Sequence, residues 1–344
     1  MTIEPGNPPT PPPPPTAPPP PPPLRREGHV LVLSGRFDPT ADLVVEELNR
    51  RAVPVFRADL AEFPVELSLA ASFDGVAWTG SLRSDRRELD LGAVRSVYYR
   101  RPTRPRFPAG MSPPARRVAE REARLGFGGL LAALPCRWLP PPGPAADAEY
   151  KPLQLRVAAE CGLAVPRTLI TNDLAAARAF AADVAGPVVY KPFGPVRGVL
   201  DGESVAVYAS VVDPTELDDP AITTTAHLFQ EAVPKAYECR LTVVAGRVFA
   251  AEIHAGSDAA RVDWRRDYDS LTYKICDPPP PVTRGVLAML DTLGLPYGAF
   301  DFVITPVGEW VMLEVNPSGQ YGFVEQATGL PIKAAIADYL EGVT

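Results

Sequence analysis

The spacing of apolar residues changes along the chain, and the first folded signal begins at residue 29. Residues 29–34 form an apolar run, residues 41–51 place apolar side chains on one helical face, and residues 53–57 form a second apolar run. This order predicts strand, helix and strand, with the two strands parallel, because a helical crossover joins parallel neighbours. Another strand is expected at 96–99, and a hairpin or meander at 67–82. The N-terminal part of the chain is therefore predicted to be an α/β domain with an open parallel sheet.

Beyond this domain the pattern mixes helical and strand segments. The stretch 115–134 is rich in Ala, Arg, Glu and Leu and predicts one long helix, and the Pro and Gly residues at 140–144 predict a linker between domains. An α+β arrangement is expected after the linker. Helices are expected at 151–162, from the cap at 171–173 to 184, at 282–293 and at 333–340, and strands at 165–170, 188–193, 204–210, 228–231, 239–244, 247–253, 299–304 and 310–315.

Proline is concentrated near the N-terminus, where residues 5–23 hold 14 of the 43 prolines. Missing amide donors prevent helices and sheets there and favour an extended polyproline conformation. We expect a solvated, disordered tail; the alternative is a ligand for proline-reading domains or a docking arm. The predicted organisation has five parts: the tail at 1–26, an N-terminal α/β domain at 27–110, a helix and linker at 111–150, a central α+β lobe at 151–228 and a C-terminal α+β lobe at 229–344.

The charge balance excludes some classes of function. The chain has 41 acidic and 34 basic residues, a net charge of −7, so we expect no nucleic-acid partner, because phosphate backbones select an excess of Lys and Arg. No apolar run approaches the roughly 18 residues of a membrane-spanning helix, and we expect no membrane contact. The four cysteines lie far apart without a C-x-x-C pair, and the N-terminus lacks the features of a signal peptide. A cytoplasmic protein is expected.

Three oxygen-bearing side chains interrupt the last pair of apolar strands. Asp301 lies in the first strand, and Glu314 and Asn316 lie two positions apart in the second. Because side chains alternate along a strand, Glu314 and Asn316 point to one face, and hairpin pairing can bring Asp301 beside them. Mg²⁺ prefers such oxygen ligands and shares them with nucleotide phosphates, and a pair of ions neutralises a transferring phosphate. The other interpretation is that all three are polar ends of buried strands, which are unfavourable to desolvate without cations.

Two of the five lysines are candidates for phosphate binding. Lys191 ends a short apolar strand and precedes a loop with several glycines, which suits an ammonium group that reaches phosphates, and Lys151 begins a predicted helix. Residues 230–234 form a strand end followed by Pro, which resembles a hinge whose main-chain groups contact an adenine edge; the alternative is a strand end with a solvated carboxylate. Arg265 lies in a basic loop and can stabilise charge on a transferring phosphate, although a solvated loop is the alternative interpretation.

Taken in order, these residues resemble the ATP-grasp ligase family: Lys151, Lys191, Gln230, Glu231, Ala232, Val233, Asp301, Glu314 and Asn316. In that family ATP lies between a central and a C-terminal lobe, behind a Rossmann-like N-terminal domain. The resemblance covers about residues 28–340 and implies the ATP-grasp fold. The motif G-x-x-x-x-G-K-[ST] does not occur in the sequence, which argues against a P-loop NTPase.

Within that family, the chain is most similar to the peptide maturases that make graspetides, which are ribosomal peptides with macrocyclic ester or amide links. The segments that carry this resemblance are 97–102, 149–155, 166–172 and 314–323, together with Trp138. It implies ATP and two Mg²⁺ ions as cofactors and a precursor peptide with a leader as partner, and it is compatible with a homodimer. It assigns ATP binding to Lys151, Lys191, Gln230, Glu231, Ala232 and Val233, metal binding to Asp301, Glu314 and Asn316, and catalysis to Lys191, Arg240 and Arg265.

One segment departs from the family pattern. These maturases carry Asp-x-Arg in the strand after the hinge, whereas this chain has Glu238-Cys239-Arg240. The charges are kept, and the acid is longer by one methylene. The resemblance implies that Glu238 and Arg240 contact the substrate and that Arg240 also faces the transferring phosphate.

The implied activity is ATP-dependent activation of Asp or Glu side chains of the precursor as acyl phosphates. A Ser, Thr or Lys side chain of the same peptide then displaces phosphate and forms an intramolecular ester or amide. One alternative is an ATP-grasp ligase that adds an amino acid to a small molecule or to a protein C-terminus with the same ATP-binding residues. The other is a nucleotide-binding module without catalysis, in which the proline-rich tail recruits a partner.

Deletion of residues 1–26 tests the tail. Because a solvated polyproline segment contributes no packing, we expect the truncated protein to retain the rate of ADP release and the melting temperature of the full chain. Loss of activity at an unchanged melting temperature would instead assign the tail to substrate or partner docking.

Overall fold

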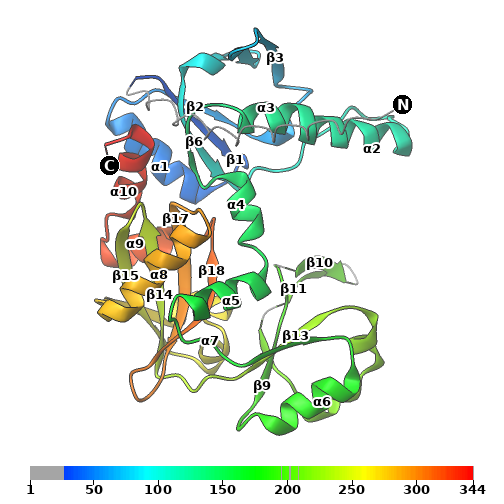
Figure 1. Ribbon diagram of the computed structural model, residues 1–344, viewed down its shortest axis with the longest axis vertical. Helices are drawn as coiled ribbons and strands as arrows, with labels where there is room; N and C mark the ends of the chain where they lie inside the picture. The colour runs from blue at the N-terminus through cyan, green and yellow to red at the C-terminus, as the bar shows by residue number, and fades with distance from the viewer. Residues whose placement is uncertain (1–26, 195, 201–202, 208, 344) are drawn as a thin grey trace, which may run out of the picture.

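The computed structural model describes residues 27–194, 196–200, 203–207 and 209–343, and the proline-rich segment 1–26 lies outside these residues. The chain forms a parallel sheet with flanking helices, a five-stranded antiparallel sheet and a smaller lobe beside it (Figure 1). The predicted mixture of α/β and α+β structure is confirmed. Within the described ranges, no helix is both long and apolar enough to span a bilayer.

The N-terminal sheet has the strand order β2-β1-β6-β7, and each neighbouring pair is parallel. Its elements are β1 (His29–Ser34), α1 (Pro39–Arg50), β2 (Val55–Ala58), β6 (Val94–Arg100) and β7 (Arg137–Leu139), with an antiparallel appendage of β3 (Ser68–Phe73), β4 (Trp78–Arg83) and β5 (Glu88–Asp90). The apolar side chains of β1 are fully buried on both faces, as a central parallel strand requires. Asp38 caps α1, because its carboxylate accepts hydrogen bonds from the amides of Thr40 and Ala41.

The segments on either side of β7 differ from the predicted single helix and linker. The helix begins at Pro113 and is divided into α2 (Pro113–Glu122), a π-helical turn (Ala123–Phe127) and α3 (Gly128–Ala132). The predicted linker at 140–144 is wrong in part, because α4 (Pro142–Asp147) begins inside it. Proline is well tolerated in the first turn of a helix, where its missing N–H has no partner to lose.

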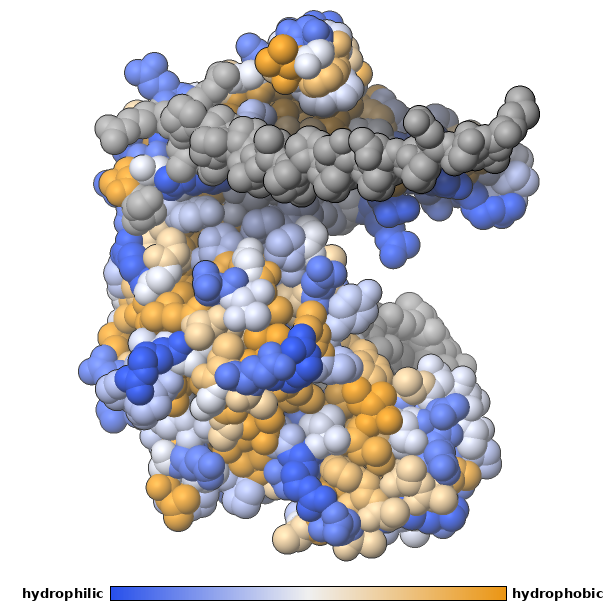
Figure 2. Space-filling model, viewed as in Figure 1, coloured by the Kyte–Doolittle hydropathy of each residue, from blue (hydrophilic) through white to orange (hydrophobic). Residues whose placement is uncertain are grey.

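The smaller, central lobe is a sheet in the order β12-β9-β13-β8 with α6 packed on it. Its elements, with the helix that leads into it, are α5 (Lys151–Glu160), β8 (Thr168–Thr171), α6 (Leu174–Asp183), β9 (Val188–Lys191), β10 (Val196–Leu200), β11 (Glu203–Val207), β12 (Ser210–Val211) and β13 (His227–Glu231). The single strand predicted at 204–210 is wrong: β11 forms a hairpin with β10, whereas β12 pairs with β9. In the space-filling view, the molecule is hollowed between the arm formed by α2 and the central lobe (Figure 2).

The C-terminal lobe is an antiparallel sheet in the order β16-β15-β14-β17-β18. Its elements are β14 (Tyr237–Val244), β15 (Arg247–Ala255), α7 (Asp258–Val262), β16 (Leu271–Ile275), α8 (Pro280–Thr292), β17 (Tyr297–Ile304), β18 (Trp310–Asn316), α9 (Gly322–Thr328) and α10 (Ile332–Glu341). One face packs against α5 and α8 through Phe300, Phe302 and Met312. The opposite face packs at one end against α1, α9 and α10 through Tyr297 and Ala299. Polar side chains occupy the rest of that second face.

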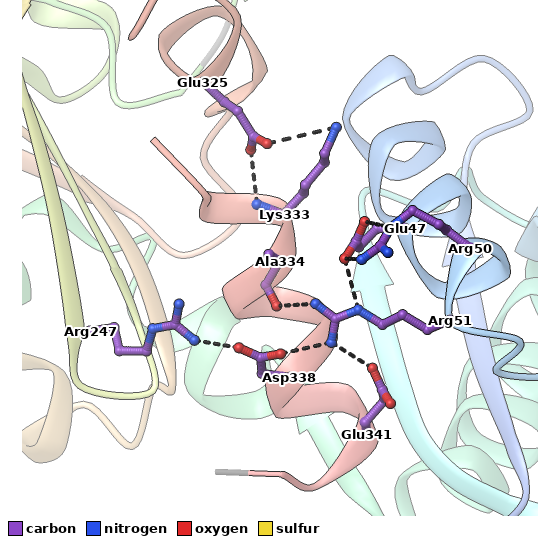
Figure 3. A network of polar contacts seen from close by, with 9 residues as sticks. All are labelled: Glu47, Arg50, Arg51, Arg247, Glu325, Lys333, Ala334, Asp338 and Glu341. Carbon is purple, nitrogen blue, oxygen red and sulfur yellow. Dashed lines mark hydrogen bonds and ion pairs between the residues drawn. The ribbon is translucent and has the colours of Figure 1, made fainter. Parts of the chain in front are cut away.

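A group of ion pairs joins α1 to α10 and to the hairpin between β14 and β15 (Figure 3). Arg51, directly after α1, pairs with Glu47 at 2.8 Å and with Asp338 and Glu341 at 2.7 Å each. Asp338 also pairs with Arg247 of the hairpin. These contacts tie the beginning of the folded chain to its end.

The carboxylates of this network titrate below their ordinary range. Hydrogen bonds from Arg50 and Arg51 lower the pKa of Glu47 to about 2. Burial raises the pKa of Asp338, but the guanidinium groups of Arg51 and Arg247 outweigh it and lower the pKa overall. The network therefore stabilises the fold above about pH 4, where the carboxylates of the unfolded chain are also ionised, and this contribution is lost as pH falls toward about 2.

The substitution Arg51→Met keeps most of the side-chain volume and removes the charge. We expect it to lower the free energy of unfolding by about 2 kcal/mol near neutral pH, because it takes partners from half-buried carboxylates. The difference from wild type shrinks below about pH 4, where protonation weakens the same contacts in the wild type. Urea unfolding at several pH values measures both effects. The matched control is Arg156→Met, which breaks an exposed pair with Glu160 and is expected to change the free energy by less than about 0.5 kcal/mol. Equal losses in the two variants would contradict a special role for Arg51.

Candidate active site

The three predicted metal ligands come together on the polar part of the antiparallel sheet. Asp301 in β17 lies opposite Glu314 in β18, and the side chain of Asn316 donates to Glu314 Oε1 at 3.3 Å. Asp301 is 5% exposed, and its Oδ1 accepts no hydrogen bond of ordinary geometry from any described residue, although Arg240 Nη1 lies 3.2 Å from it. A buried carboxylate oxygen in this state is favourable only beside a cation. The donor set therefore fits a divalent metal ion that prefers oxygen.

Only two of these donors are carboxylates. The part of the chain that the structure describes holds no group of three His, Cys, Asp or Glu side chains that could bind a metal ion. Mg²⁺ held by Asp301, Glu314 and Asn316 would need further oxygen ligands, which phosphates and water supply. The set therefore suits a metal shared with a nucleotide rather than one enclosed by protein.

Lys151, the first residue of α5, forms an ion pair with Glu314. Gln154 fixes this helix against β18: its Nε2 donates to the carbonyl oxygen of Val315 at 2.9 Å, and its Oε1 accepts from the Val315 amide at 3.0 Å. The sequence did not single out Gln154. Two features of the sequence could have identified Gln154. It lies three residues after Lys151, on the same side of the helix, and it belongs to the segment 149–155 that carries the family resemblance.

Two arginines reach the same carboxylates from other elements. Arg265, in the short 3-10 turn Trp264–Arg266, donates through Nη2 to Asp301 Oδ2 at 2.7 Å and to Glu314 Oε1 at 3.0 Å. Arg240 in β14 lies opposite Asp301, with Nη1 at 3.2 Å from Oδ1. The ring centre of Trp264 lies 5.4 Å from the guanidinium carbon of Arg240 and 5.1 Å from that of Arg265. These cation–π contacts hold both arginines toward the carboxylates, and Trp264 is a second residue that the sequence did not identify.

Charge compensation governs protonation in this cluster. Burial alone would raise the pKa of Glu314, but the charges of Lys151 and Arg265 hold it well below its usual range. Burial raises the pKa of Asp301 in spite of its arginine neighbours, and it lowers the pKa of Lys191, the last residue of β9, to about 8. Four cations, Lys151, Lys191, Arg240 and Arg265, face three carboxylates, Asp301, Glu314 and Asp263, the last of which pairs with Arg265 at 3.6 Å. Such an excess of positive charge suits an anionic ligand such as a phosphate.

The segment 230–233 connects the central and C-terminal lobes. Gln230 is 3% exposed, and its side chain donates to a threonine hydroxyl of β8 at 2.9 Å. The amides of Glu231 and Ala232 donate to carbonyl groups of the central lobe at 3.0 and 2.8 Å. These two amides are therefore engaged within the protein, and Val233 carries the next amide that could face an adenine.

Glu238 shares a face of β14 with Arg240 but has its own counter-ion. Its carboxylate pairs with Lys235 at 3.0 Å, and the residue is 8% exposed. Burial raises the pKa of Glu238 to about 6 in spite of Lys235, and the charge of Asp301 adds to the rise. The structure thus brings Glu238 close to the carboxylate cluster without making it part of the ion pairs.

Comparison with known proteins agrees with this architecture. A family model of the MvdD pre-ATP-grasp domain matches residues 29–143, and no curated protein matches the chain. Macrocyclase MdnB from Microcystis aeruginosa MRC is 32% identical, with a TM-score of 0.77 over 91% of this chain and 99% of that one. Macrocyclase MdnC from the same organism, bound with precursor peptide MdnA, is 29% identical, with a TM-score of 0.80 over 91% and 98%. A RiPP-associated ATP-grasp ligase from Chryseobacterium gregarium, in complex with ADP and a leader and core peptide, is 26% identical, with a TM-score of 0.85 over 92% and 97%.

A charged cluster on an antiparallel sheet, beside a smaller lobe and a parallel-sheet domain, defines the ATP-grasp class of ligases. The predicted ATP-grasp fold with a pre-ATP-grasp domain is thereby confirmed. With 32% identity over almost all of MdnB, the chain belongs to the family of ATP-grasp peptide macrocyclases. The resemblance to graspetide maturases is confirmed as well.

Proposed function

We propose that this protein is an ATP-dependent macrocyclase of a ribosomal precursor peptide. It activates Asp or Glu side chains of the peptide and joins them to Ser, Thr or Lys side chains as esters or amides. The observation that carries the proposal is the pair Asp301 and Glu314, which is held by cations from three separate elements. The bound ADP, leader and core peptide of the Chryseobacterium gregarium relative support ATP as cofactor and a precursor with a leader as partner.

The residues divide into three binding roles. Lys151 and Lys191 bind phosphate oxygens, and the segment from Gln230 through Glu231 and Ala232 to Val233 contacts the adenine. Asp301, Glu314 and Asn316 would hold two Mg²⁺ ions. When bound, Mg²⁺ neutralises phosphate charge and aligns the groups for in-line transfer. Lys151 pairs with Glu314, and Arg265 pairs with both carboxylates, so both cations lie beside the proposed metal ligands.

The chemistry follows from the weak electrophilicity of a carboxylate. A carboxylate oxygen of the peptide attacks the γ-phosphorus of ATP, the bond to the bridging oxygen breaks, and an acyl phosphate and ADP form. A hydroxyl or amine of the same peptide then attacks the acyl carbon, phosphate leaves, and the proton of the nucleophile passes to solvent. Lys191, Arg240 and Arg265 stabilise the charge on the phosphoryl oxygens, and Glu238 and Arg240 contact the peptide. The mechanism uses no nucleophile from the protein.

Mass spectrometry of a gene-neighbour precursor peptide tests this function. With the protein, ATP and Mg²⁺, we expect the peptide to lose the mass of one water for each cross-link, and alkaline hydrolysis then separates esters from amides. Glu314→Gln removes a metal-binding charge, so we expect it to abolish both the mass loss and ADP release while the melting temperature shows a folded protein. Glu309→Gln, on the exposed turn between β17 and β18, is the matched control and keeps full activity.

Two results would contradict the proposal. Turnover by the Glu314→Gln protein would remove Glu314 from the mechanism. An unchanged peptide mass, with ADP released when free amino acids are supplied, would instead identify a ligase for small molecules.

Lys191 predicts a pH dependence of nucleotide binding. Because burial lowers its pKa to about 8, the ammonium group loses its proton, and its attraction for phosphate, as pH rises above that value. We expect the dissociation constant for ADP to rise several-fold between about pH 7.5 and 9.5. Lys191→Arg is the control, because a guanidinium stays charged over this range and keeps the constant level. Calorimetric titration measures both proteins, and an equal rise in both would assign the effect to another group.

A further inference from the structure

A residue of the N-terminal domain holds the loop that follows the metal-binding strand. Arg100, the last residue of β6, donates through Nη1 to the carbonyl oxygen of Ser318 at 2.7 Å. The next carbonyl, of Gly319, accepts a hydrogen bond from the Tyr297 hydroxyl at 2.7 Å. Ser318 lies two residues after Asn316. Two successive carbonyl groups, shortly after the proposed metal ligand Asn316 in the sequence, are therefore held by residues outside the loop.

The loop has little room to move. A Cβ added to Gly319 would overlap with the Cβ of Ala299, so a side chain cannot be accommodated there. The amide of Gly319 also donates to the carbonyl oxygen of Asn316 at 3.1 Å, which closes a turn at the end of β18. The position of the loop thus determines how the backbone of Asn316 leaves the sheet.

Arg100 lies in an unfavourable environment for a guanidinium. It is 2% exposed, and the nearest carboxylate, Asp38, is 3.8 Å from its Nε and already caps α1. Its Nε and Nη2 make no hydrogen bond of ordinary geometry with any residue that the structure describes, although the Tyr98 hydroxyl also lies beside the guanidinium. The adjoining cavity of about 10 Å³ has room for a single water molecule. An apolar side chain of similar size would stabilise this buried position at least as well.

Contact between the two domains is secured elsewhere. Apolar residues of β1 and α1, including Val30 and Val44, pack against Ile332 and Ile336 of α10. Arg51 adds its ion pairs to the same helix (Figure 3). Cohesion therefore does not account for a buried Arg100, whereas its bond to the loop does.

We propose that Arg100 is a positioning residue for the metal site. Through Ser318 it fixes the backbone that follows Asn316 and keeps the Asn316 side chain beside Glu314. The N-terminal domain thereby contributes to Mg²⁺ binding without supplying a ligand. The inference rests on the proposed function, because it assumes that these three side chains hold Mg²⁺.

Calorimetric titration of ADP with and without Mg²⁺ tests this role without turnover. Arg100→Met keeps the buried stem and removes the donor, and we expect it to weaken Mg²⁺-dependent ADP binding by about tenfold while metal-free ADP binding stays at the wild-type value. Tyr297→Phe removes a single oxygen from the second contact, folds with minimal disturbance, and is expected to shift binding in the same direction. Arg51→Met is the matched control: it lowers the melting temperature and leaves the effect of Mg²⁺ unchanged.

The outcomes separate this inference from the proposed function. If Mg²⁺ strengthens ADP binding by Arg100→Met and Tyr297→Phe as much as it does in the wild type, the role of Arg100 is overturned and the proposed function stands. An equal change in Arg100→Met and Arg51→Met would also overturn it, because it would reduce Arg100 to domain cohesion. If the wild-type protein binds ADP equally with and without Mg²⁺, the metal assignment of the proposed function fails, and this inference fails with it.

Discussion

Two buried carboxylates on one face of a largely apolar sheet need cations beside them. The positions of several elements around the sheet depend on this requirement. Asp301 and Glu314 lie on neighbouring strands, where burial opposes the ionisation of both. The sheet supplies only one of the compensating charges, Arg240 of β14. The others come from outside it: Lys151 from the start of α5, Arg265 from the turn after α7 and Lys191 from the end of β9. Without these elements docked in place, the sheet would carry uncompensated buried charge.

Three contacts that hold neighbouring elements against the end of β18 are hydrogen bonds from side chains to the main chain. Gln154 bonds to both main-chain groups of Val315, Arg100 bonds to the carbonyl of Ser318, and the Tyr297 hydroxyl bonds to the carbonyl of Gly319. Helix α5, the N-terminal domain and β17 therefore all converge on the end of β18. A hydrogen bond to the backbone restrains position and direction together, which is what a metal site of few ligands requires.

The sequence was sufficient to predict the carboxylates because strand geometry is simple. Glu314 and Asn316 share a face by alternation, and the short turn at 305–309 makes a hairpin with the strand of Asp301 the natural pairing. The sequence could not predict which residues the cations contact. Arg265 lies in a turn without periodicity, and the contact of Arg100 joins residues 218 positions apart, for which no local pattern exists.

The same limit explains the wrong secondary-structure predictions. Proline at 140–144 is equally typical of a linker and of the first turn of a helix, and only packing decides between them. The apolar stretch 204–210 looks continuous, although its two halves pair with different strands. Local pattern predicts that a segment is extended, but the choice of its neighbour depends on residues distant in sequence.

The use of lysine and arginine in the cluster follows the same electrostatics. Only 5 of the 34 basic residues are lysines, yet two of them lie here. A guanidinium keeps its charge when buried, and Arg265 reaches both carboxylates through one nitrogen. An ammonium group loses affinity for its proton on burial, as the lowered pKa of Lys191 shows. The two arginines thus keep the charge that the carboxylates require, whereas the charge of Lys191 responds to its surroundings. Lys151 is held in the same cluster by its ion pair with Glu314.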